Sequence, residues 1–151
     1  MSANSATGSA APSIQKWVID SDVEKQLRSS ALHWRLLGKG LSHASIELYL
    51  RCPNLTAIGW GGFQAFNTCY SLLRVDLSGC PKLESIPEAT FSDCRHLVSV
   101  VFGEHSNITN LAVAAFQRCS ALKSITLPDK PKVVEEGVYA FCTSIERVLC
   151  N

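Results

Sequence analysis

A side-chain pattern that recurs every 25 residues constrains the fold of this chain more than any other feature. Phenylalanines stand at positions 66, 91, 116 and 141. Three residues after each of the first three comes a cysteine, and three residues further on comes a leucine: Cys69, Cys94 and Cys119, then Leu72, Leu97 and Leu122. Such a repeat is typical of a solenoid, in which each unit buries its apolar face only against its neighbours.

Each unit ends in an alternating segment that predicts a short strand. The apolar pairs are Val75 and Leu77, Val100 and Phe102, and Ile125 and Leu127. Period-two alternation places these side chains on one face, and stacked units would pair their strands into a parallel sheet. Phenylalanine and cysteine would then form ladders through the core, where cysteine fits because it is small and often buried. Ile46, Leu48 and Leu50 predict a first strand, so we expect about four units over residues 43–151.

The unit Ala115–Pro128 resembles the BspA-like class of leucine-rich repeats. Units of that class read Ala-Phe-x-x-Cys-x-x-Leu-x-x-Ile-x-Leu-Pro, and residues 115–128 match this pattern nearly throughout. The resemblance covers roughly residues 46–150. It implies an α/β repeat fold, a leucine-rich-repeat solenoid with short parallel strands, and a role in adhesion or protein–protein binding. The class has no shared catalytic residues to carry over.

Two segments depart from the pattern. Residues Trp60 to Phe63 form an insertion that the later units lack. In the last unit Cys142 follows Phe141 directly, so with Phe141 as the aromatic position two residues are missing before Ile145 and Val148. We align Val133 with Leu83 and Ile108 in the same register.

The N-terminal segment predicts a tail followed by a cap. Residues 1–13 are small or polar and uncharged apart from the terminus, and we expect a flexible tail. Residues 14–42 would form the cap, with a helix at about Asp22–Leu37 covering the first strand. A capping box starts at Ser21, apolar side chains fall on one helical face, and Gly38 is placed to end the helix.

The C-terminal end of the solenoid lacks a predicted cap. The sequence stops at Asn151, just after Arg147, Val148 and Leu149, with no polar helix to cover the final strand. Uncovered strand edges and core side chains favour association. We therefore expect this end to be covered by a protein partner, by a second copy, or by sequence beyond residue 151.

The outward positions of the strands form a second candidate binding surface. They are Arg74 and Asp76, Ser99 and Val101, Ser124 and Thr126, and Arg147 and Leu149. Val101 and Leu149 are apolar where polar residues are expected, which indicates a binding face or merely tolerated surface residues. Trp60 and Phe63 are candidate interface anchors on a Gly-rich insertion, or fold back over the cap.

Composition and motifs argue against catalysis and against several classes of ligand. A net charge of +1 gives no field that favours nucleic acid, and no apolar stretch reaches the roughly 18 residues of a membrane-spanning helix. The four histidines and seven cysteines show neither metal-site spacing nor a catalytic motif, so we expect no metal and no cofactor.

Two functions remain open from the sequence. The first is an intracellular, probably cytoplasmic, protein–protein interaction module: a scaffold or accessory subunit of a larger assembly, expected because no signal peptide is visible. The alternative is a surface adhesin or antigen-type protein, which would require a leader that this sequence does not show.

Overall fold

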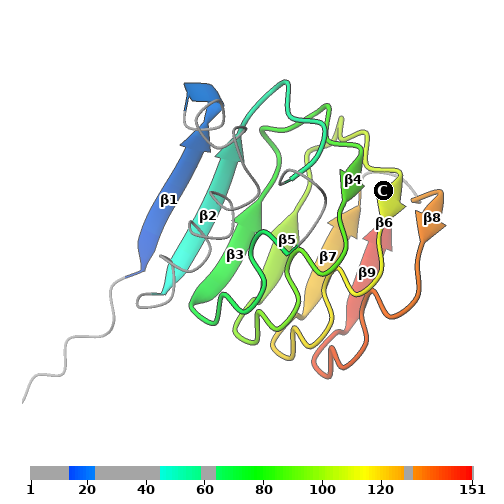
Figure 1. Cartoon of the computed structure of the whole chain (residues 1–151). Helices are drawn as coiled ribbons and strands as arrows, with labels where there is room; N and C mark the ends of the chain where they lie inside the picture. The colour runs from blue at the N-terminus through cyan, green and yellow to red at the C-terminus, as the bar shows by residue number, and fades with distance from the viewer. Residues whose placement is uncertain (1–13, 23–44, 59–63, 128–130, 151) are drawn as a thin grey trace, which may run out of the picture.

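A parallel sheet of six strands dominates the structure, a computed structural model that describes residues 14–22, 45–58, 64–127 and 131–150. Its strands lie side by side in chain order (Figure 1): β1 Gln15–Asp20, β2 Ile46–Arg51, β3 Leu72–Asp76, β5 Ser99–Val101, β7 Ser124–Leu127 and β9 Arg147–Cys150. A smaller parallel sheet forms another side of the solenoid: β4 Ser85–Ile86, β6 Asn110–Leu111 and β8 Val133–Val134. The parallel solenoid expected from the repeat is therefore confirmed.

The strand register confirms the 25-residue period in the middle of the solenoid. Val75 pairs with Val100, and Val100 pairs with Ile125. All three side chains are essentially buried, with exposed fractions of 0 to 2%. The alternating positions between them point outward, so each turn contributes one apolar rung to a continuous core.

Aromatic rings and thiols form the two predicted ladders. Phe66, Phe91 and Phe116 are stacked with centroids 5.5 Å apart and rings 5° from parallel. Each ladder thiol donates to the backbone oxygen of the aromatic residue one turn earlier; the Sγ of Cys94, for example, lies 3.1 Å from the oxygen of Phe66. The repeat therefore encodes hydrogen bonds between turns as well as apolar contacts.

The register expected for the last turn is wrong. The ring that stacks on Phe116 belongs to Tyr139, at 5.9 Å, whereas Phe141 is 66% exposed. The thiol of Cys142 then takes the cysteine position and donates to the oxygen of Phe116 at 3.0 Å. The aromatic-x-x-Cys spacing is thus kept, at a distance of 23 residues from the preceding turn.

The backbone of the last turn supports the same correction. Each earlier turn has left-handed residues two positions before and two after its aromatic rung, as with Ala114 and Arg118 around Phe116. In the last turn these residues are Gly137 and Phe141, which flank Tyr139. Phe141 therefore occupies a strained corner position and not a core position.

The two missing residues lie between β7 and β8. Val133 pairs with Asn110, and Val134 pairs with Leu111, so Val133 is not the counterpart of Ile108 as we expected. From Phe102 to Asn110 the chain advances eight positions, but from Leu127 to Val133 it advances only six. The shortening falls in a connection, where it leaves the core spacing of the turn intact.

The sheet begins within the segment expected to form only a cap. β1 pairs in parallel with β2 along its whole length, and Ile19 is buried while Trp17 packs partly against the core. The predicted helix at Asp22–Leu37 lies outside the described residues except for Asp22. The described residues include no helical element, so the capping helix is not supported.

Candidate protein-binding surfaces

The strand register brings the predicted outward residues into two rows across the six-stranded sheet. One row runs through Lys16, Glu47, Arg74, Ser99, Ser124 and Arg147. The other runs through Val18, Tyr49, Asp76, Val101, Thr126 and Leu149. The sequence therefore identified the outer face from β3 to β9, and the structure extends it to β1 and β2.

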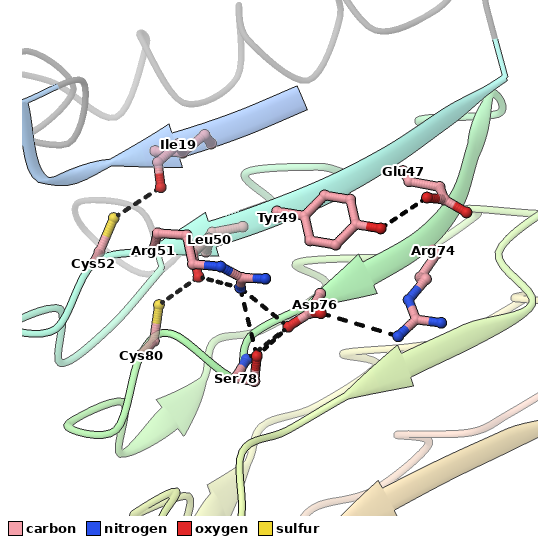
Figure 2. A network of polar contacts seen from close by, with 10 residues as sticks. All are labelled: Ile19, Glu47, Tyr49, Leu50, Arg51, Cys52, Arg74, Asp76, Ser78 and Cys80. Carbon is pink, nitrogen blue, oxygen red and sulfur yellow. Dashed lines mark hydrogen bonds and ion pairs between the residues drawn. The ribbon is translucent and has the colours of Figure 1, made fainter. Parts of the chain in front are cut away.

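Charged and aromatic side chains cluster on the part of this face that β2 and β3 form (Figure 2). Tyr49 donates its hydroxyl proton to Glu47 at 2.8 Å, which raises the pKa of Tyr49. The guanidinium of Arg51 lies 5.2 Å from the centre of the Tyr49 ring. These contacts hold both charged side chains beside the ring and order this part of the surface.

Asp76 is the hub of the cluster, and its carboxylate is engaged within the fold. Oδ1 accepts hydrogen bonds from the backbone nitrogen of Ser78 at 3.0 Å, from its hydroxyl at 2.6 Å, and from Arg51 at 3.2 Å. Arg74 approaches Oδ2 to 4.0 Å. Burial opposes ionisation, but the hydrogen bonds from Ser78 and Arg51 outweigh it and lower the pKa of Asp76.

This arrangement makes Asp76 a poor candidate for direct contact with a partner. Only 7% of the residue is exposed, and a partner would have to compete with three hydrogen bonds already made. Arg74 retains the larger exposed surface, with 41% of its side chain accessible. Of the two predicted residues on β3, Arg74 is the one available to a partner.

The centre of the outer face is uncharged and half-buried. β5 and β7 present Ser99, Val101, Ser124 and Thr126 there, in register across the two strands. Small side chains leave this strip low between the charged cluster and β9. Such a strip accommodates an extended segment but supplies few strong anchors of its own.

The last described turn exposes side chains at positions that are core in the turns before it. Val148 is 47% exposed, compared with 0 to 2% for its counterparts Val75, Val100 and Ile125. In the smaller sheet Val134 is 51% exposed, whereas Ile86 and Leu111 are fully buried. Leu149, on the outer face of the same turn, is 44% exposed. An apolar surface thus surrounds the edge strand β9.

The sequence analysis anticipated Val148 and Leu149 in this surface but missed Val134 and Phe141. It missed them because the assumed register treated Phe141 as a core ring. The aromatic-x-x-Cys spacing of Tyr139 and Cys142 was the available signal. Trp60 and Phe63, the other predicted anchors, lie outside the described residues.

The thiols of the cysteine ladder are poorly suited to nucleophilic chemistry. Burial raises the pKa of Cys94, Cys119 and Cys142, so these groups are protonated at neutral pH. Within the described part of the chain, no three histidine, cysteine or acidic side chains are grouped so that they could hold a metal ion. A search of the same residues found no helix with the length and apolar character needed to cross a membrane.

Comparison with known proteins identifies the repeat. Residues 50–151 match the family model described as "BspA type Leucine rich repeat region (6 copies)". No curated protein and no solved structure gave a significant match. Solenoids of this kind are typically non-enzymatic and mediate protein interactions. Because the match covers about two thirds of the sequence, the chain belongs to the BspA-type leucine-rich-repeat family.

Proposed function

We propose that this chain is a non-enzymatic protein-binding module that serves as a scaffold or accessory subunit of a larger assembly. Its contact surface is the last described turn, together with the adjoining outer face of the sheet. The observation that carries the proposal is the half-exposure of Val148 at a position that is buried in the three preceding turns. Exposed apolar side chains beside an unpaired strand edge favour association.

The size of this apolar surface predicts weak rather than permanent association. Complete burial of a Val or Leu side chain is worth about 1.5–3 kcal/mol, so covering the half-exposed Val134, Val148 and Leu149 would contribute about 1 kcal/mol each. Association itself costs on the order of 4–15 kcal/mol, so the edge of β9 and the outer face must contribute as well. We therefore expect a dissociation constant in the micromolar to millimolar range.

A second copy is the first partner to test, because this surface is complementary to itself. Two β9 strands related by a two-fold axis can pair antiparallel with Val148 opposite Val148 of the second copy. The pairing keeps both valines on the core side and sets Arg147 opposite Leu149 of the second copy. No like charges then face each other directly.

The test is the molar mass of the full chain by light scattering, from micromolar to near-millimolar concentration. We expect the wild-type mass to rise toward that of a dimer, and Val148→Asp to remain monomeric because it places an unpaired charge in the interface. Val98→Asp is the matched control, since Val98 is also partly exposed but lies in an earlier turn. A monomeric wild type throughout, or equal effects of the two substitutions, would contradict self-association through β9.

A further inference from the structure

A small hollow lies at the corner of the solenoid that follows the aromatic ladder. It has a volume of about 310 Å³ and is lined by Arg95, Arg118, Ser120 and Phe141. The 25-residue period and the shortened last turn bring these residues together from three successive turns. Arg118 and Phe141 occupy equivalent left-handed positions, and Asp93 occupies the same position one turn earlier.

The charges around the hollow do not cancel. Nε and Nη2 of Arg95 both donate to Oδ1 of Asp93, at 3.3 and 3.1 Å. Nη1 of Arg118 comes only to 3.8 Å from Oδ2, which is beyond hydrogen-bonding distance. Two guanidinium groups therefore share one carboxylate, and the excess positive charge resides mainly on Arg118. More than half of each arginine side chain is exposed.

An exposed aromatic ring lies beside this excess charge. The guanidinium of Arg118 is 5.6 Å from the centre of the Phe141 ring, close enough for the ring to orient it. Phe141 is 66% exposed, so most of its surface is available for apolar contact. The hydroxyl of Ser120 donates to the backbone oxygen of Arg95 at 3.3 Å and completes the wall.

We propose that this hollow binds a carboxylate carried on an apolar body, with Arg118 contacting the carboxylate and Phe141 packing on the apolar part. One negative charge matches the single excess positive charge. A dianionic phosphate would place its second charge near the carboxylate of Asp93. The same chemistry occurs in an acidic side chain next to apolar residues of a protein partner and in a free aromatic acid.

The first experiment titrates the full chain with phenylacetate, acetate, phenylacetamide and inorganic phosphate, with binding followed by NMR or calorimetry. We expect phenylacetate to bind more tightly than the other three. Because hydrogen bonds to a charged group are worth about 1.5–3 kcal/mol, Arg118→Gln should weaken phenylacetate binding by about tenfold or more. Phe141→Ala should weaken the binding of phenylacetate but not that of acetate.

The control is Arg74→Gln, which removes the same charge from the outer face of β3 and should leave the affinity unchanged. Circular dichroism spectra of the variants, compared with the wild type, show that each has folded. Equal binding of phenylacetate and phenylacetamide would overturn the proposal. So would phosphate binding at least as tight as phenylacetate, or equal effects of Arg118→Gln and Arg74→Gln.

A second titration distinguishes the two sources of the carboxylate. A peptide with blocked ends and the sequence Phe-Glu-Phe competes with phenylacetate for the hollow. Tighter binding of the peptide would identify the ligand as an acidic side chain of a protein partner, whereas tighter binding of phenylacetate would identify a small aromatic acid. Failure of both to bind would overturn the site. Because Val148→Asp leaves the hollow intact, the test is independent of self-association through β9.

Discussion

Removal of individual aromatic rings tests the ladder and the register of the last turn together. Phe91 is fully buried and stacks on rings on both sides, at 5.5 Å in each case. Replacement of a buried phenylalanine by alanine costs about 3–5 kcal/mol, and each stacked pair adds about 0.5–1.5 kcal/mol beyond the area that it buries. We therefore expect Phe91→Ala to lower the free energy of unfolding by about 4–5 kcal/mol.

The last turn provides two contrasting substitutions. Tyr139 is half-buried and stacks on Phe116, so Tyr139→Ala should cost roughly half as much as Phe91→Ala, about 2 kcal/mol. Phe141 is mostly exposed and lies at a left-handed corner. Phe141→Ala should change stability by about 0.5 kcal/mol, while Phe141→Gly should be neutral or stabilising because glycine adopts this conformation without strain.

The assay is urea unfolding followed by circular dichroism, with identical conditions for all four variants. The structure predicts the order Phe91, then Tyr139, then Phe141 for the loss caused by alanine. If Phe141→Ala cost as much as Phe91→Ala and Tyr139→Ala cost little, the uninterrupted 25-residue register would be right and the corrected register wrong.

Three further substitutions or conditions test other parts of the fold. The thiols of Cys94, Cys119 and Cys142 have raised pKa values, so stability should be constant below their ordinary pKa of 9.0 and fall above it, by up to about 4 kcal/mol per pH unit for three thiols, as measured by urea unfolding at several pH values. For Asp76, whose pKa is lowered, NMR titration should give a pKa below 3.8, and the stability it contributes should be lost as pH falls through that value; Asp76→Asn should cost about 1–2 kcal/mol. A Cβ at Gly79 would lie 2.7 Å from the backbone oxygen of Leu50, so Gly79→Ala should cost about 1–3 kcal/mol in thermal unfolding. A pH-independent stability between 9 and 10, an ordinary Asp76 pKa, or a neutral Gly79→Ala would each contradict the corresponding contact.

The middle of the solenoid was predictable because each turn repeats the same physical problem. Val75, Val100 and Ile125 fill equivalent core positions, so their spacing defines strand, register and inward face at once. The outward position of Val101 followed from the same alternation. Repetition thus converted a weak local signal into a reliable one.

The last turn and β1 were harder to predict for different reasons. A deletion in a connection changes the spacing of Tyr139 without changing its core contacts, so strict counting assigned its role to Phe141. β1 has only one fully buried side chain, Ile19, and gains its strand pairing from β2 rather than from a strong pattern of its own. The hollow beside Arg118 was equally hidden, because its residues meet only when the shortened turn is stacked correctly.

The central claim is that the turn carrying β9 is a contact surface, and amide hydrogen exchange tests it most directly. Exchange in the wild-type chain is measured residue by residue at low and at high protein concentration. The account predicts that the amides of Arg147–Cys150 become more protected at high concentration, while those of Ser99–Val101 in the middle of the sheet do not change. Exchange rates in β9 that stay the same across the whole concentration range would contradict it.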